Sequence, residues 1–202
     1  MNITNKLYLN RYSTRILSED NFSLEQWNDF YQSLDEELKT WSLDLQSYPN
    51  VEDFWKKRLS NYFINPNTGE PGSVPMPTFG KNLGIWCSDT DKLIGYFSVF
   101  IVSLPPEHKE KPIAMFLHSY VVKKEHHKKG LAKLGLNTYI EEINKSYFRL
   151  SPSTKKIKHL ARIWDYNLGS MKLAESLGFQ RLTQCASNDK GVEYNYVKDY
   201  WR

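Results

Sequence analysis

The stretch from Tyr120 to Leu134, YVVKKEHHKKGLAKL, joins an apolar β-branched segment to a basic loop and then to a helical pattern. It predicts a buried strand over Ile113–Val122 and a helix over Gly130–Ile143. The first backbone N–H groups of a helix have no partner inside the helix, and the helix dipole places partial positive charge there. Gly130 lets a ligand approach the backbone, and the small Ala132 adds little bulk. The stretch therefore predicts a site for a phosphate or pyrophosphate group.

The distribution of charge along the chain supports an anion site in this half. Residues 1–100 contain 9 Lys and Arg against 13 Asp and Glu, and residues 101–202 contain 18 against 10. The two halves therefore carry net charges of −4 and +8, and the second half is expected to meet an anion. The lysines that surround the predicted helix start are Lys123, Lys124, Lys128, Lys129 and Lys133.

Several other kinds of site lack their sequence motifs. The chain contains no G-x-x-x-x-G-K-[ST] or G-x-G-x-x-G run, and no G-x-S-x-G nucleophile elbow. His126 and His127 are adjacent, without a Cys or acidic partner at ligand spacing, so we expect no metal site. The basic run lacks interleaved aromatic residues that would stack on bases, which disfavours nucleic acid. Judged alone, the run also fits a solvated helix start.

Length and composition predict one globular domain over residues 1–202. The chain is 40% hydrophobic and 25% charged, which is enough to bury a core. Its longest apolar stretch, 93–104, is far shorter than the roughly 20 residues of a membrane helix, and Met1–Asn5 do not open a signal peptide. Cys87 and Cys185 form no disulfide framework, so we expect two half-buried thiols in the reducing cytoplasm.

Periodicity elsewhere predicts a mixed sheet flanked by helices. The expected strands are Leu9–Ile16, Leu83–Cys87, Leu93–Val102, Ile113–Val122, Ile157–Trp164, Phe179–Cys185 and Val192–Val197. The expected helices are Leu24–Leu38 after a start at Ser18–Asn21, 51–62 after Pro49 and Asn50, Gly130–Ile143, and Gly169–Leu177 with Gly178 as its stop. The remaining stretches, Asn65–Pro77 with its prolines and glycines and Leu104–Lys111, are expected to be loops without helix or strand.

Two segments resemble motifs of the GCN5-related N-acetyltransferase (GNAT) superfamily. The superfamily signature [Q/R]-x-x-G-x-[G/A] is similar to HKKGLA at 127–132, with His in place of Gln or Arg. The family pattern N-x-x-[A/S]-x-x-L followed by G-F is similar to NLGSMKLAESLGF at 167–179. The likeness extends loosely over 7–202, and its opening looks like the ribosomal-protein and N-terminal-amine acetyltransferases. The resemblance implies an α/β (α+β) fold with a mixed, mostly antiparallel central sheet of about six to seven strands and flanking helices.

The resemblance also implies acetyl-CoA as co-substrate and assigns residues to it. The loop that would hold the pyrophosphate consists of His127, Lys128, Lys129, Gly130, Leu131 and Ala132. The backbone of Tyr120, Val121 and Val122 would pair with the pantetheine arm, which Asn167 would also hold, and the Val122 N–H would donate to the oxyanion. Many relatives use a Tyr, four residues before the Gly of G-F, as the acid for the leaving thiolate. Ala174 occupies that position here, so Ser170, one helical turn earlier, is the candidate acid.

The candidate general base is His118. It shares strand parity with Tyr120 and Val122, so the three side chains should face the same way, and a His has an ordinary pKa near neutral pH. The alternative for His118 is a hydrogen-bonded core residue. Further base candidates on the preceding loop are Glu107, His108 and Glu110, and the tryptophans that could line a pocket are Trp27, Trp41, Trp55 and Trp86.

These features predict direct acetyl transfer from acetyl-CoA to a primary amine, with no covalent enzyme intermediate. The acceptor would be a protein N-terminus, a lysine or a small-molecule amine, and the acidic first half favours a cationic one. The alternatives are a non-catalytic module that binds CoA or acyl-CoA, suggested by Ala174, and a nucleic-acid-binding protein, suggested by charge alone. The acceptor and the oligomeric state do not follow from the sequence.

Overall fold

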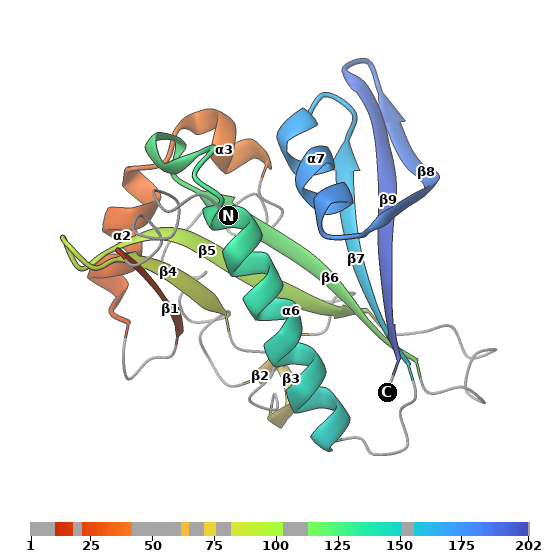
Figure 1. Ribbon diagram of the computed structural model, residues 1–202, viewed down its shortest axis with the longest axis horizontal. Coiled ribbons are helices and arrows are strands. Elements are labelled where there is room, and N and C mark those ends of the chain that lie inside the picture. Colours follow the sequence, from red (N-terminus) through yellow and green to blue (C-terminus); the bar gives the residue numbers. More distant parts are fainter. Residues whose placement is uncertain are drawn as a thin grey trace. The chain divides into compact units, whose positions relative to one another are not determined.

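A computed structural model describes residues 11–17, 22–41, 62–64, 71–75, 82–102, 113–150 and 156–201 (Figure 1). Its strands are β1 (Tyr12–Ile16), β2 (Tyr62–Ile64), β3 (Pro71–Pro75), β4 (Leu83–Cys87), β5 (Lys92–Val102), β6 (Ile113–Val122), β7 (Lys156–Trp164), β8 (Gln180–Asn188) and β9 (Gly191–Trp201). Its helices are α2 (Leu24–Gln32), α3 (Glu36–Trp41), the 3-10 helix η3 (Lys124–His126), α6 (Leu131–Leu150) and α7 (Leu168–Ser176).

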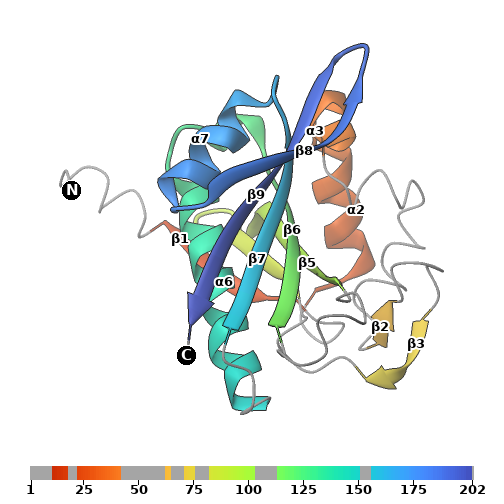
Figure 2. The ribbon, with the colours of Figure 1, turned by 90° about the vertical axis from the view of Figure 1, so that its right-hand side faces the viewer.

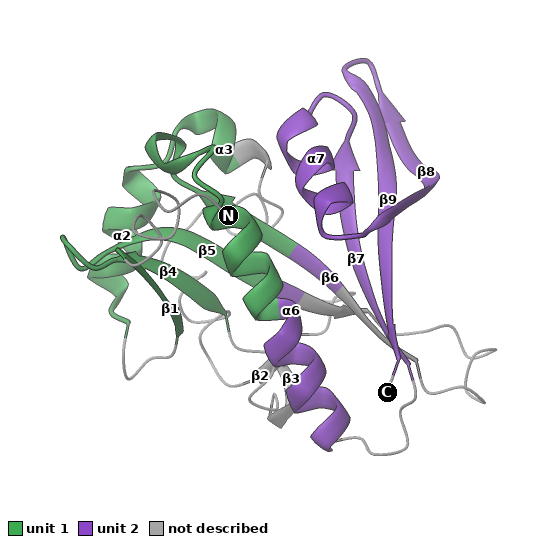
Figure 3. Ribbon diagram, viewed as in Figure 1, with its two compact units in different colours: residues 1–98, 119–139 green, residues 99–118, 140–202 purple. Residues whose placement is uncertain are grey.

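The chain divides into two compact units (Figure 3). Unit 1 comprises residues 1–98 and 119–139, and unit 2 comprises 99–118 and 140–202, so β5, β6 and α6 each contribute to both. The strands form a seven-stranded sheet in the order β1-β4-β5-β6-β7-β9-β8, with a separate pair β2-β3. Most of the pairings are antiparallel, whereas β6 and β7 run parallel. The predicted mixed, mostly antiparallel sheet with flanking helices is confirmed.

In unit 1, helices cover both faces of the sheet. Ser23 caps α2 through a capping box, and Trp27 and Phe30 of that helix are buried in one cluster with Trp86, Tyr96 and Val121. On the other face, α6 approaches the sheet closely at Gly135, since a Cβ there would overlap the ring of Phe97. The predicted pocket tryptophans Trp27 and Trp86 are therefore core residues, while Trp55 and the side chain of Trp41 lie outside the described part.

In unit 2, β7, β9 and β8 lie side by side (Figure 2). Alternate residues of β7 are buried, which places Ile157, His159, Ala161 and Ile163 on one face. The parallel pairing of β6 with β7 extends from Ile113↔Lys156 to Leu117↔Leu160. Helix α7 contacts β7 and β8, and the chain leaves it through Gly178, whose φ is +80°. The left-handed conformation explains the glycine at this helix end.

Most predicted elements are confirmed, some with longer bounds. The hairpin of β4 and β5 turns through 88–91, and β6, β7 and α7 lie within one residue of their predicted bounds. Helix α6 extends seven residues past Ile143, and β8 and β9 extend past Cys185 and Val197. Of the predicted first strand, the structure describes Tyr12–Ile16. Among the described residues, no helix is long and apolar enough to cross a membrane.

Three predictions for the first 80 residues are wrong. The helix Leu24–Leu38 is interrupted at Ser33–Asp35, where the Ser33 hydroxyl donates to the carbonyl of Phe30 at 2.6 Å. Short polar side chains compete in this way with the helical hydrogen bonds. Tyr62 belongs to a strand rather than a helix, and β3 lies inside the predicted loop Asn65–Pro77. Prolines are the end residues of β3, and strand ends of a two-stranded pair tolerate a missing N–H.

Other predictions concern residues outside the described part. These are the helix start at Ser18–Asn21, the helix over 51–61 and the loop Leu104–Lys111. The loop includes the candidate bases Glu107, His108 and Glu110.

Candidate active site

The residues between β6 and α6, Lys123–Gly130, form what we call the basic junction of unit 1. Its first turn is η3, where the N–H groups of His126 and His127 donate to the carbonyls of Lys123 and Lys124 at 2.9 and 3.0 Å. The backbone φ is then +59° at Lys128 and +79° at Gly130, but not positive at Lys129. Backbone that alternates between right- and left-handed conformations directs successive N–H groups toward one side, which is an arrangement suited to an anion.

Gly130 occupies the position before the first residue of α6 and has no side chain to cap that helix. A Cβ added to Gly130 would meet no atom within 4 Å, so the glycine serves the positive φ and leaves the space in front of it open. Leu131 is buried and anchors the first turn, while its N–H lies at the helix start. Unit 1 therefore leaves the space in front of the N-terminus of α6 open at Gly130.

The lysines of this region divide into two groups. Those with exposed side chains are Lys124, Lys128, Lys129 and Lys133. Lys123 is only 8% exposed, and its Nζ lies 5.6 Å from the ring centre of Phe30. Burial, opposed in part by the charge of Glu125, lowers the pKa of Lys123. Lys123 therefore belongs to the α2 side of the core and does not add to the exposed positive charge as expected.

His127, at the first signature position, secures the basic junction to the end of β6. Its Nε2 lies 2.8 Å from the carbonyl oxygen of Val122, which requires a proton on Nε2. Its own N–H is bonded to Lys124, as above. In the same turn, the Tyr12 hydroxyl lies 3.3 Å from Nδ1 of His126, which joins β1 to η3. His127 thus contributes to the shape of the loop through both its ring and its amide.

The side chains of Tyr120, Val121 and Val122 are all packed within unit 1. Val121 lies in the α2 cluster, Val122 is buried, and Tyr120 stacks on Phe97 with ring centres 5.9 Å apart. Pairing with β5 continues one residue past the strand, since the Lys123 N–H donates to the carbonyl of Ile94 at 2.9 Å. What this segment can offer a ligand is therefore its backbone.

In unit 2, the candidate base His118 belongs to a chain of three side chains. Its Nε2 lies 2.7 Å from Nδ1 of His159, whose Nε2 lies 2.8 Å from Oδ1 of Asn144 on α6. His118 and His159 are 6% and 0% exposed. Burial lowers the pKa of His118 to about 3, and burial with the nearby charges of His118 and Lys198 lowers that of His159 well below its ordinary value. Both imidazoles are therefore neutral at pH 7.

The second motif forms the start of α7 in unit 2. The side-chain oxygen of Asn167 accepts from the N–H of Ser170 at 3.1 Å, so Asn167 is the N-cap of this helix. Ala174, at the position of the family's Tyr, is buried, and Ser170 lies half-buried one turn earlier on the same side.

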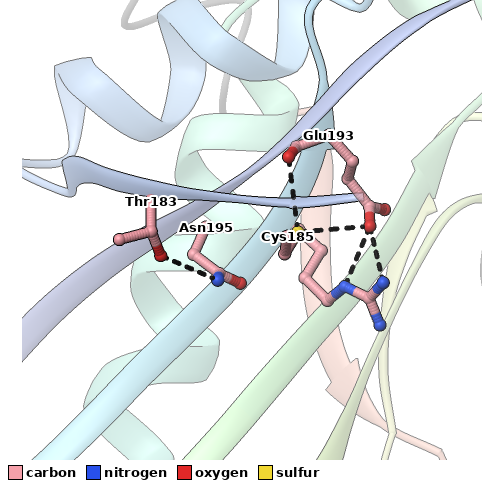
Figure 4. Close-up of polar contacts among 5 residues, drawn as sticks. Thr183, Cys185, Glu193 and Asn195 are labelled. Atoms are coloured by element: carbon pink, nitrogen blue, oxygen red, sulfur yellow. Dashed lines mark hydrogen bonds and ion pairs between the residues drawn. The ribbon is translucent and has the colours of Figure 1, made fainter. Parts of the chain in front are cut away.

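Sequence reasoning missed a polar cluster on β7, β8 and β9 (Figure 4). Arg162 donates through Nε and Nη2 to Oε2 of Glu193 at 3.0 and 2.6 Å, and the Cys185 thiol lies 3.3 Å from the same oxygen. Asn195 Nδ2 lies 3.5 Å from the Thr183 hydroxyl. Only the strand register brings these residues together, and neither composition nor spacing reveals it.

The cysteines differ from one another, against expectation. Cys87 is half-buried as predicted, but Cys185 is exposed; both are free thiols. Burial and the hydrogen bond to Glu193 raise the pKa of Cys185. Within the described ranges, no group of three His, Cys, Asp or Glu side chains is placed to hold a metal ion.

With this geometry in place, comparison with known proteins identifies the family. The sequence model of the Acetyltransferase (GNAT) family matches residues 27–179. The chain belongs to this family. GNAT proteins are acyltransferases, so the chain is one of them by family. No curated protein matches the sequence.

Solved structures share the GNAT fold at low sequence identity. The ribosomal-protein-S5-alanine acetyltransferase from Vibrio fischeri is 16% identical, with a TM-score of 0.61 over 93% of this chain and 92% of that one. The yncA protein from Salmonella typhimurium, solved with its cofactor acetyl-CoA, is 15% identical, with a TM-score of 0.55 over 95% and 94%. The aminoglycoside N(6')acetyltransferase from Legionella pneumophila is 12% identical, with a TM-score of 0.54 over 93% and 91%.

Proposed function

We propose that this GNAT protein transfers an acetyl group from acetyl-CoA directly to a primary amine, in the cytoplasm. The observation that carries the proposal is the basic junction, where two positive φ angles and exposed lysines stand at the N-terminus of α6. A relative of the same fold has been solved with acetyl-CoA, which supports the choice of co-substrate.

The residues of the chain fit this co-substrate. The pyrophosphate would be held by the amides of the loop from His127 through Ala132, because the helix dipole and the turn direct positive charge to one place. The exposed lysines add charge-assisted contacts to phosphate oxygens. The backbone of Tyr120–Val122 and the side chain of Asn167 would hold the pantetheine arm. When bound, the co-substrate supplies an activated thioester.

Proton transfer is assigned to two residues of unit 2. His118 would accept the proton of the attacking amine, and Ser170 would donate to the departing thiolate, because Ala174 cannot. The low pKa of His118 keeps its imidazole neutral at every pH above about 4. We therefore expect no inflection near pH 6.5 from His118 in the profile of kcat/KM, and a loss of at least 100-fold in kcat for His118→Ala.

The first test is calorimetric titration with acetyl-CoA, followed by an assay of thiol release with a panel of primary amines. The panel contains a peptide with a free N-terminus, a lysine peptide, a polyamine and an aminoglycoside. We expect the wild type to bind acetyl-CoA with a micromolar Kd. The double variant Lys128→Glu with Lys129→Glu should lose roughly 100-fold in affinity, because each charged contact contributes about 1.5 kcal/mol.

A matched control is Lys172→Glu, an exposed lysine on α7 of unit 2, which should leave affinity within twofold. Equal losses in both variants, or no binding by folded wild type, would overturn the assignment of the basic junction.

The non-catalytic alternative rests on Ala174. It predicts acetyl-CoA binding with no amine-dependent thiol release from any member of the panel. The nucleic-acid alternative predicts binding of a plain oligonucleotide that weakens steeply with salt and is indifferent to CoA. The ribosomal-protein-S5-alanine acetyltransferase and the aminoglycoside N(6')acetyltransferase are named for different amine acceptors, so the panel includes one acceptor of each kind.

A further inference from the structure

The hydrogen-bonded chain of His118, His159 and Asn144 in unit 2 lies at the end of the pairing between β6 and β7. The parallel ladder between β6 and β7 ends at the pair Leu117↔Leu160. His118 follows Leu117 directly, and His159 precedes Leu160, so the two rings join the strands where their backbone pairing ends. The rings are stacked with centres 5.0 Å apart, and the rings of His159 and Tyr200 form a T-shaped pair with centres 5.2 Å apart.

The hydrogen bonds of this chain have one consistent direction. The side-chain oxygen of Asn144 can only accept, so His159 carries its proton on Nε2. A neutral His159 then has its lone pair on Nδ1, and the Nε2 of His118 must donate to it. This assignment leaves the lone pair of His118 on Nδ1. One amide oxygen, 15 residues from His159 along the chain, thereby sets the tautomer of the first ring.

We infer that His159 and Asn144 are positioning residues that hold His118 in the tautomer with its lone pair on Nδ1. The inference rests on the proposed function, in which His118 is the base. Two buried imidazoles are costly in a core unless each is hydrogen-bonded, and apolar side chains would fill the same space without that cost. Their presence in series at the end of the ladder is explained if the orientation of His118 matters for proton transfer.

The decisive experiment compares two substitutions of similar size at position 159. His159→Asn places an acceptor oxygen near the position of Nδ1, whereas His159→Gln places its amide near Nε2 and removes the acceptor for His118. We expect kcat to be at least tenfold higher in His159→Asn than in His159→Gln, with the Kd for acetyl-CoA unchanged within twofold. Equal kcat values in two folded variants would overturn the inference, because a packing role does not distinguish the two.

A second readout is the pH profile. Asn144→Asp keeps the acceptor and adds a carboxylate, which should raise the pKa of the histidine pair against the opposing charge of Lys198. We expect the acid limb of kcat/KM to move up by at least one pH unit. An unchanged acid limb in a variant with wild-type kcat at pH 8 would contradict the inference.

The nitrogen resonances of the His118 ring provide a test that needs no variant and no substrate. In the wild type at pH 7, we expect a protonated Nε2 and an unprotonated Nδ1; the opposite tautomer would overturn the assignment. If the wild type acetylates no amine, the proposed function fails while this spectrum still tests the positioning. If the wild type is active and His118→Ala keeps more than a third of kcat, the positioning inference fails and the acetyltransferase assignment stands.

Discussion

The basic junction of unit 1 and the polar groups of unit 2 use charge and hydrogen bonds in opposite ways. At the basic junction, lysine side chains are exposed around a helix whose N-cap position is a glycine. In unit 2, polar side chains bond to groups of the same unit: His118 to His159, Arg162 to Glu193, and Asn167 to the backbone N–H of Ser170.

The difference separates residues that contribute mainly to the stability of the fold from residues that contribute mainly to ligand binding. Polar groups that hydrogen-bond to one another inside a unit contribute to the stability of the protein. Removal of one partner leaves the other unsatisfied and lowers that stability. Exposed charges around a helix start contribute little to stability, because water screens their interactions. Substitutions of these polar groups of unit 2 should therefore change the free energy of unfolding. Substitutions of the exposed lysines of the basic junction should change the affinity for acetyl-CoA instead.

The largest stability effect is expected from Arg162→Met. The Glu193 side chain is only 6% exposed, so removal of Arg162 leaves a buried carboxylate without its charged partner and, among the described residues, with only the Cys185 thiol as a donor. We expect a loss of roughly 2 kcal/mol in the free energy of unfolding, less than for a fully buried pair because Arg162 is 41% exposed. The control is Arg11→Met. Arg11 lies 3.7 Å from Asp89, and their side chains are 64% and 58% exposed, so this substitution should cost about 0.5 kcal/mol or less. Chemical denaturation measures both, and similar losses would remove the distinction.

The histidine chain predicts a stability that depends on pH. The folded-state pKa of His118 is about 3, and the unfolded value is near 6.5, so the unfolded chain binds more protons between these values. Stability is therefore fully present above pH 6.5 and is lost as pH falls below it, by about 2 kcal/mol for His118 between pH 7 and pH 5. His159 adds in the same direction. Denaturation at the two pH values should show a smaller difference in His118→Gln than in wild type.

Alanine substitutions at two glycines with the same backbone conformation distinguish the cost of backbone strain from an effect on ligand binding. Gly130 and Gly178 have φ of +79° and +80°, and a Cβ at either position has no close neighbour under 3.8 Å. Alanine at each should cost about 1–2 kcal/mol of stability, because an L-residue is strained at this φ. Only Gly130→Ala should also weaken the binding of acetyl-CoA, by roughly tenfold, because it alone changes the backbone of the proposed anion site. Weaker binding in both variants, measured by calorimetry, would mean that instability rather than local shape is the cause.

Local signals made the basic junction and most of the strands predictable from sequence. A β-branched apolar run, a basic loop and a glycine before a helical pattern lie next to one another in the chain, so β6 and α6 were predicted from neighbouring residues. The loop between them was predicted, but not its 3-10 turn η3. The interruption at Ser33 was missed because it depends on a side chain that competes for one carbonyl. Strand β3 was missed because its prolines and Gly72 are typical of a loop, and because Tyr62 of its partner β2 was predicted as the end of a helix.

The polar groups of unit 2 were less predictable because their partners are distant in sequence. His118 was singled out, but His159 lies 41 residues away and Glu193 lies 31 residues from Arg162. Only the register of β6, β7 and β9 brings such pairs together, and period-two patterns give the face of a residue but not its neighbour. Asn167 was predicted from its motif as a ligand of the pantetheine arm, whereas its geometry also makes it a helix cap.

Asn167 therefore tests whether one side chain serves both purposes. Asn167→Ala removes the acceptor for the Ser170 N–H and should cost about 1 kcal/mol of stability. Asn167→Asp retains that acceptor, and with it the cap, but lacks the amide NH2 that a ligand carbonyl would accept from. If the amide also holds the pantetheine arm, the aspartate variant should recover wild-type stability while its Kd for acetyl-CoA stays several-fold weaker. Recovery of both the stability and the affinity would instead assign Asn167 to the folding of unit 2 alone. The basic junction would then contribute to the binding of acetyl-CoA, and the start of α7 would contribute only to stability.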